Sequence, residues 1–169
     1  LWLGRLSVGR KLTLIYLLDL CAVIYVSGIL IHEKFLAIDF ARKEIVGTTY
    51  TEVVRTNLMG SFMVPAPSSQ AREAALDRLE AVRSDYDEIL QTTDRSAQFA
   101  VLQAKGLGAT DAQKTQLLDQ GRTLLTTVGN QSNLILDPDL DSYYVMSLAL
   151  LRFPELLQIL HDTRKFMQA

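Results

Sequence analysis

The sequence has few residues of the types that form disulfides, bind metal ions or catalyse reactions. Among 169 residues there is a single cysteine, Cys21, so no intrachain disulfide can form. The two histidines, His32 and His161, do not lie in an H-E-x-x-H zinc motif, and no G-x-S-x-G occurs. The pair Gly106 and Gly108 lacks the third glycine of a dinucleotide loop. We therefore expect no catalytic residue, no metal site and no cofactor in this chain.

Strong charge and strand patterns are also missing. The net charge is −2, so there is no excess of basic residues that would indicate nucleic acid as a partner. Period-2 alternation bounded by turns is absent, which excludes a sheet as the main element. The length suits one domain of moderate size. Together these observations predict an all-α protein.

One long apolar run stands out near the start of the chain. Residues 12–31, LTLIYLLDLCAVIYVSGILI, contain one charge, Asp19. About 20 apolar residues in a helix cross a hydrocarbon core of roughly 30 Å. The alternatives are a signal peptide, whose apolar part is usually about 7–15 residues long, and a buried helix of a soluble protein. Asp19 would be neutral, or would face another helix, because a charge at mid-membrane is costly.

These features predict a cytoplasmic tail over residues 1–11, a transmembrane helix over residues 12–31 and an extracytoplasmic helical domain over residues 32–169. The orientation is weakly encoded, because basic residues flank the apolar run almost equally on both sides. The chain opens with Leu1, and we expect it to be a piece of a longer protein; the sequence leaves open whether the sensor domain continues beyond Ala169 or a second membrane span follows it.

The rest of the chain predicts four helices. The first continues from the apolar run to about residue 62, the second covers residues 70–105, the third begins near residue 110 and the fourth near residue 138. The breaks are VPAPSSQ (64–70) and GLGAT (106–110), because proline and glycine interrupt helices. We expect an antiparallel up-down-up-down four-helix bundle whose last helix returns to the membrane side, with a kink at Pro154. Residues at spacings of three and four predict its core, including Leu79, Val82, Leu117, Gly121, Leu124, Val128, Met146, Leu150, Leu157 and Leu160.

Three alternating aspartates precede the fourth predicted helix. Asp137, Asp139 and Asp141 match the first three ligands of an EF-hand loop, but Ser142 and Leu148 stand where glycine and glutamate are required. Helix initiation explains the same residues without a metal. Asp137 can cap the helix, Pro138 suits its first turn, and acidic residues favour the positive helix end.

Arginine and tyrosine side chains provide the candidate ligand site. If the first and fourth helices are antiparallel, Arg55 lies level with Tyr144, and Tyr50 lies level with Arg152. Together with Tyr143, these residues would offer an arginine fork and tyrosine hydroxyls to a small carboxylate. The alternative is that the arginines lie on solvated faces and the tyrosines belong to the core.

Two motifs carry a family resemblance. ARKEIVGTTY (41–50) resembles a K-E-x-x-G-x-x-Y run in the first periplasmic helix of bacterial receptors, and SNLILDPDLDSYYVM (132–146) resembles a longer motif of helical sensor regions. The chain is thus similar to the N-terminal sensor region of methyl-accepting chemotaxis proteins and sensor histidine kinases. The resemblance implies signal input across the bacterial inner membrane, a homodimer, an unidentified small-molecule ligand and an output module outside this chain. A membrane-anchored helical scaffold that binds other proteins is the rival interpretation.

Overall fold

The computed structural model describes residues 7–63, 65–105, 110–136 and 144–168 of the chain. Every element in those ranges is helical, which confirms the predicted all-α class. The chain divides into two compact units, Leu1–Ala41 and Arg42–Ala169, which are treated separately below. The predictions for residues 137–143 fall outside the described residues, so the structure does not address Asp137, Pro138, Asp139, Asp141 or Tyr143.

The first unit consists of the N-terminal part of helix α1 (Val8–Phe62). Its most apolar stretch has a mean hydropathy of 2.4, and none of that stretch is buried against other parts of the protein. Within the described residues, α1 is the one helix long and apolar enough to cross a membrane. Side chains such as Leu18, Ile24 and Tyr25 are more than half exposed, as expected of a surface that a lipid phase would cover.

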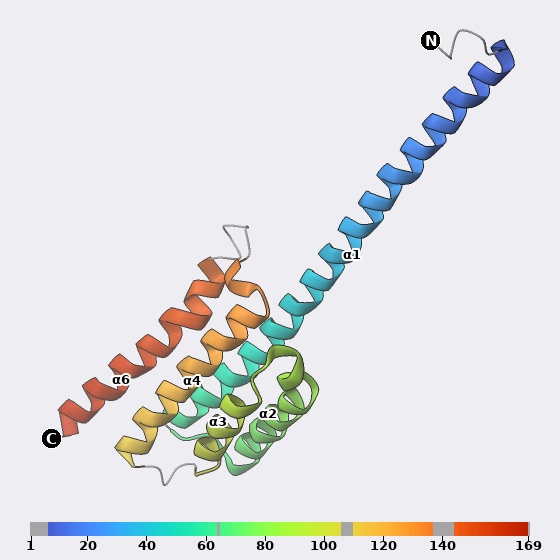
Figure 1. Ribbon diagram of the computed structural model, residues 1–169. Helices are drawn as coiled ribbons and strands as arrows, with labels where there is room; N and C mark the ends of the chain where they lie inside the picture. The colour runs from blue at the N-terminus through green and yellow to red at the C-terminus, as the bar shows by residue number, and fades with distance from the viewer. Residues whose placement is uncertain (1–6, 64, 106–109, 137–143, 169) are drawn as a thin grey trace. The chain divides into compact units, whose positions relative to one another are not determined.

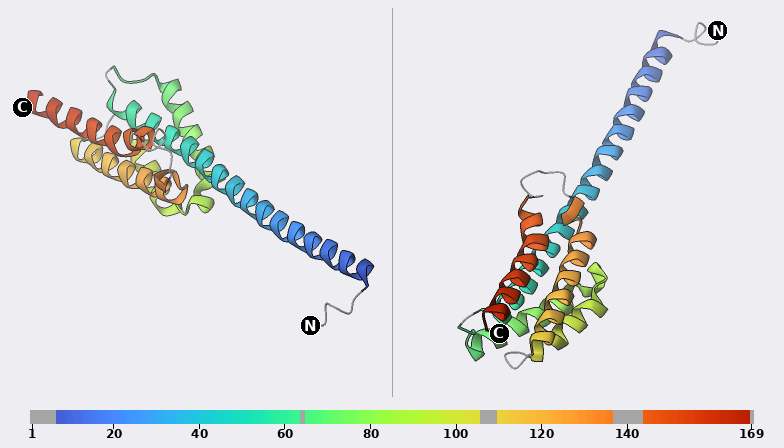
Figure 2. Two further views of the ribbon diagram at one scale, coloured as in Figure 1. Left: turned by 90° about the horizontal axis from the view of Figure 1, so that it is seen from above. Right: turned by 90° about the vertical axis from the view of Figure 1, so that its left-hand side faces the viewer.

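The second unit is a bundle built on the C-terminal part of α1. It adds α2 (Ser69–Leu90), α3 (Thr93–Lys105), α4 (Asp111–Gln131), a 3₁₀ turn η3 (Leu134–Leu136), a π-helical segment η4 (Ser147–Arg152) and α6 (Phe153–Gln168). Within this unit, α2 and α3 form a hairpin and α4 lies beside α6 (Figures 1 and 2). Its core joins Tyr50, Val54 and Leu58 of α1 to leucines of α2 and α4.

Local chemistry fixes the helix starts where the sequence predicts them. Pro65 and Pro67 separate α1 from α2, and the Ser68 hydroxyl accepts the backbone N–H of Ala71 at 3.2 Å. At the start of α4, Thr110 and Gln113 form a reciprocal capping box, with the Thr110 N–H donating to Gln113 Oε1 at 2.8 Å. The helix predicted to begin near residue 110 thus begins at Asp111, directly after its cap.

The predicted continuous helix over residues 70–105 is wrong. Gln91 takes a left-handed conformation with φ of 52°, ends α2 and turns the chain back on itself. The start of α2 and the end of α3 consequently lie together, because Arg72 Nη2 donates to the carbonyl oxygens of Gln103 and Ala104 at 3.2 and 3.1 Å. The bundle therefore contains one reversal more than the four-helix prediction allowed.

That extra reversal changes the direction of the last helix. The guanidinium carbon of Arg55 lies 5.2 Å from the centre of the Phe153 ring, and the rings of Phe62 and His161 meet edge to face with their centres 5.7 Å apart. Because later residues of α1 contact later residues of α6, the two helices run parallel here. A helix of the opposite direction would pair Phe62 with residues before Phe153. The expectation that the last helix returns to the end of the bundle where α1 enters is therefore wrong.

Pro154 is accommodated by a change of helix type. The Phe153 N–H donates to Leu148 O, five residues earlier, and residues Ser147–Arg152 form a π-helical segment. Proline has no N–H, so a regular helix would leave the Leu150 carbonyl unpaired at this point. The wider turn redistributes these hydrogen bonds. The kink expected at Pro154 stays a prediction.

Replacing Gln91 with glycine is expected to raise the free energy of unfolding by up to about 1 kcal/mol, because glycine adopts positive φ without a steric cost. The matched control is Gln98→Gly in the exposed middle of α3, which is expected to lower stability by about 1 kcal/mol. Denaturant unfolding followed by circular dichroism measures both. Equal losses for the two variants would contradict a left-handed residue at Gln91.

Candidate functional site

A buried carboxylate, Asp87, joins three helices of the bundle. Tyr50 Oη on α1 donates to Asp87 Oδ1 at 2.6 Å, and Thr92 Oγ1 donates to the same oxygen at 2.7 Å. The Ser96 hydroxyl donates to Asp87 Oδ2, and Arg83 Nε lies 3.7 Å from that oxygen. Because hydroxyls and one cation satisfy both carboxylate oxygens, this cluster is arranged to hold the hairpin against α1.

The Tyr50 hydroxyl is held in its protonated form. Burial raises the pKa of Tyr50 above its ordinary value of 10.0, and the hydrogen bond and negative charge of Asp87 raise it further. The neighbouring hydroxyls of Thr92 and Ser96 lower the pKa, but they do not outweigh burial and Asp87. Tyr50 is completely buried, so its hydroxyl is a structural donor within this cluster.

The structure does not make the predicted arginine–tyrosine pairs. Tyr50 is bonded to Asp87, and Arg152, whose side chain is 69% exposed, pairs with Glu155 at 3.0 Å. Tyr144 is 65% exposed. The pairing assumed antiparallel first and last helices, whereas the observed helices are parallel and place Arg55 beside Phe153. Tyr50, Arg55 and Arg152 thus have separate partners among the described contacts, Tyr143 lies outside the described residues, and a ligand role for any of the five residues stays a prediction.

The two motifs that carry the family resemblance meet in space. Gly47 lies in the first motif and Ser132 in the second. A Cβ atom added at Gly47 would lie 2.2 Å from Ser132 Oγ and 2.9 Å from Leu134 Cδ1. Gly47 is also the first buried residue along α1, so this close approach marks the point where α1 enters the bundle. Only glycine permits backbones to come this near at that position.

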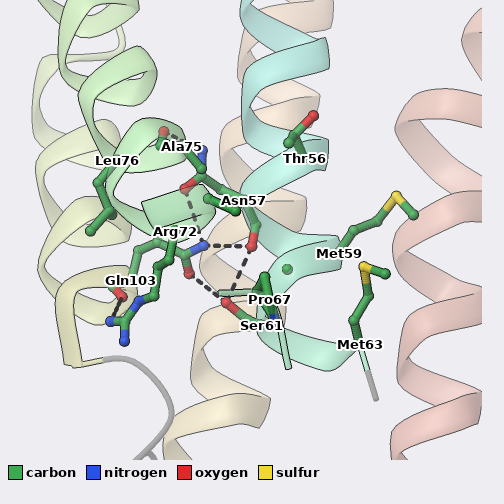
Figure 3. Close-up of a pocket in the computed structure, with 12 residues that line it drawn as sticks. Thr56, Asn57, Met59, Ser61, Met63, Pro67, Arg72, Ala75, Leu76 and Gln103 are labelled. Carbon is green, nitrogen blue, oxygen red and sulfur yellow. Dashed lines mark hydrogen bonds between the residues drawn. The ribbon is translucent and has the colours of Figure 1, made fainter. Parts of the chain in front are cut away.

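A partly enclosed hollow lies at the C-terminal end of α1. Figure 3 shows the pocket, which is enclosed by the last turns of α1, the start of α2 and the end of α3 and has a volume of about 240 Å³. The lining is mainly apolar and comprises Thr56, Asn57, Met59, Gly60, Ser61, Met63, Pro67, Ala71, Arg72, Ala75, Leu76 and Gln103. A hollow of this composition suits a small and mostly apolar molecule.

A connected set of amides forms the polar wall of the pocket. Asn57 Nδ2 donates to Val53 O and Ala75 O, both at 3.0 Å. Gln103 Nε2 donates to Asn57 O at 2.5 Å, and the Ser61 hydroxyl donates to Gln103 Oε1 at 3.0 Å. Because these amides satisfy one another, they fix the shape of the wall and leave the apolar side chains for contact with a ligand.

Sequence reasoning missed Asp87 and the amide pair Asn57 and Gln103. All three are less than a tenth exposed. Each is next to an apolar residue in the sequence, Leu58, Tyr86 or Leu102, and a polar residue that becomes buried with such a neighbour needs a partner. That requirement was the signal in the sequence that could have pointed to these residues. It does not identify the partner, because in each case the partner lies on another helix.

Neither a metal site nor a known relative identifies the chemistry. No group of three or more histidine, cysteine, aspartate or glutamate side chains in the described ranges could hold a metal ion. No family model, curated protein or solved structure matches this chain.

Proposed function

We propose that this chain is the signal-input region of a bacterial transmembrane receptor. In this proposal residues 12–31 cross the inner membrane and the bundle lies in the periplasm as part of a homodimer. The output module, of the chemotaxis or sensor-kinase type, lies outside the chain. The proposal draws on the sequence motifs and on one apolar helix of sufficient length.

The observation that carries this proposal is the course of α1. The same uninterrupted helix, Val8–Phe62, contains the apolar run and ends in the wall of the 240 Å³ pocket. A ligand that binds there touches Thr56, Met59 and Met63 on the helix that also leads into the membrane. Such a ligand changes the signalling equilibrium only if it binds one of two helix positions more tightly than the other.

The homodimer has its own support on α1. A row of exposed residues at spacings of three and four follows the helix along the bundle and leaves a face that a second copy could cover, with Ile45 and Met59 as its apolar members. The row consists of Arg42, Ile45, Thr49, Glu52, Thr56 and Met59. A membrane-anchored scaffold, the rival function, would use such a row for a different protein and would need no pocket.

A pocket-filling substitution tests the receptor function without knowledge of the ligand. Ala71→Phe places a ring in the pocket, and Ala74→Phe adds the same ring to an exposed position of α2 outside it. Cys21 is the single cysteine, so a spin label there reports the spacing of the two apolar helices in a dimer reconstituted in nanodiscs. We expect Ala71→Phe to shift the Cys21–Cys21 distance distribution and Ala74→Phe to leave it at its unsubstituted value.

Identical distributions for both variants would favour the scaffold, and a chain without any Cys21–Cys21 distance would contradict the homodimer. A thermal-shift screen of organic acids, amino acids and amines on the same sample then searches for the ligand. The expected hit loses its stabilising effect in Ala71→Phe and keeps it in Ala74→Phe.

A further inference from the structure

A second and larger hollow lies beside the last turns of α1 and shares Met59, Ser61 and Met63 with the 240 Å³ pocket. It is a groove of about 1020 Å³ between α1, the start of α4 and α6, which is called the α1–α6 groove below. Its apolar residues include Phe62, Phe153, Leu156, Leu157 and Leu160. The volume is at the upper end of the roughly 300–1,000 Å³ that small-molecule sites occupy.

The lining is exposed, apolar and adaptable. Leu156 and Leu160 are 58% and 57% exposed, although both are leucines that would normally be covered. The chain has four methionines, of which Met59, Met63 and Met167 line the groove while Met146 is buried in the core. Figure 3 shows Met59 and Met63 pointing from α1 toward α6, away from Arg72. Methionine side chains adjust to irregular apolar ligands.

The contacts between helices fix where the charged residues of the groove lie. A Cβ on Gly129 would meet Leu150, and α4 and α6 are antiparallel, so Lys114 lies level with residue 165. Arg164, which also lines the groove, therefore stands at the same level as Lys114. Both cations mark one end of the groove, and Phe153 marks the other, eleven residues or about 16 Å along α6.

The cationic end is only partly neutralised. Asp111 is the one acidic residue of the lining, against Lys114 and Arg164. Among the described residues, neither cation makes an ion pair or a side-chain hydrogen bond, and Lys114 is half-buried. A half-buried ammonium without a partner favours a bound anion.

We infer that the α1–α6 groove binds a monocarboxylate with a single unbranched acyl chain. The carboxylate lies between Lys114 and Arg164, and the chain follows the apolar side chains toward Phe153. The position of the charge separates this occupant from a partner helix, because both cations are at one end. The polar residues His161 and Thr163 lie on α6 close to that end, and most of the lining from there to Phe153 is apolar. This inference does not depend on the signalling role proposed above.

Decanoate and decyltrimethylammonium provide a matched pair of probes, with equal alkyl chains and opposite head charges. The full chain in nanodiscs, labelled with ¹³C-methyl methionine, gives one signal for each of its four methionines. We expect decanoate to shift the signals of Met59, Met63 and Met167 and to leave that of Met146 in place. Decyltrimethylammonium should produce these shifts only at a concentration at least about tenfold higher, the factor that one charge-assisted contact supplies.

Charge reversal tests the head-group position. The double variant Lys114→Glu with Arg164→Glu is expected to weaken decanoate binding at least about tenfold and to improve binding of the cationic probe. Arg122→Glu, at an exposed position of α4 outside the groove, is the control and should keep the original affinities. Equal shifts with both probes, no shift of the three groove methionines, or a loss of affinity in the Arg122 control would overturn the inference.

Discussion

Replacing Asp87 with alanine is expected to lower the free energy of unfolding by about 3–5 kcal/mol. The substitution removes the acceptor of Tyr50 Oη and Thr92 Oγ1, and both side chains are completely buried. Neither hydroxyl has another acceptor among the described contacts, whereas Ser96 keeps its bond to Thr93 O at 3.0 Å. The loss should therefore come mainly from the two buried donors left without partners, because Arg83 keeps its ion pair with Glu80 and its hydrogen bond to Ser96 Oγ.

A double-mutant cycle separates these hydrogen bonds from the volume change. Tyr50→Phe should cost about 1–2 kcal/mol in the unsubstituted chain and nothing measurable once Asp87 is alanine, because the donor it removes is then already unpaired. Asp87→Asn retains an acceptor oxygen and should cost clearly less than Asp87→Ala. Urea unfolding of the chain in detergent measures all four variants. An equal cost of Tyr50→Phe in both backgrounds would show that Asp87 and Tyr50 are not bonded.

Gly47→Ala is expected to destabilise the bundle by about 1–3 kcal/mol, although alanine is the better helix former. The new Cβ would stand 2.3 Å from Ser132 Cβ, a distance that atoms without a bond do not reach. Ser132 is completely buried, so the end of α4 and α1 must move apart to make room. The expected result is a loss of stability together with a looser contact where α1 enters the bundle.

Gly60 provides a control on the same helix. A Cβ there meets only Pro67 Cγ, at 3.7 Å, so Gly60→Ala should raise stability by up to about 1 kcal/mol. Ser132→Gly removes the two nearest atoms that the Gly47→Ala methyl would strike and leaves only Leu134 Cδ1, the end of a flexible side chain. It should therefore restore most of the loss when the two substitutions are combined. Stabilisation by Gly47→Ala, or no rescue by Ser132→Gly, would contradict the contact between the two motifs.

Much of the core could be predicted from residue spacing. Leu79, Val82, Leu124 and Val128 were expected to be buried from their three-and-four pattern, and all are buried. The pattern failed for Leu160, which is 57% exposed and borders the α1–α6 groove. Periodicity identifies a face of a helix but does not say whether a neighbouring helix covers it.

The turn at Gln91 shows why the course of the chain was harder to predict. Neither glycine nor proline marks it, and Gln91 carries the cost of positive φ. The compensation comes from groups on both sides of the turn, since the Thr92 N–H and hydroxyl both donate to Asp87, at 2.9 and 2.7 Å. The pair Thr92 and Thr93 followed by Asp94 resembles a helix start, and this was the local signal available.

The sequence by itself determined the helical class, the apolar run, the start of α4 near residue 110 and most of the buried positions. These features depend on hydrogen bonds and periodicities within a few residues, which a single segment encodes. Only the tertiary structure decided the direction of α6, the partners of Tyr50, Arg55 and Arg152, and the two hollows beside the end of α1. Each of these depends on residues far apart in the chain. One additional reversal at Gln91 changes the direction of the later helices, and with it which residues of different helices lie side by side.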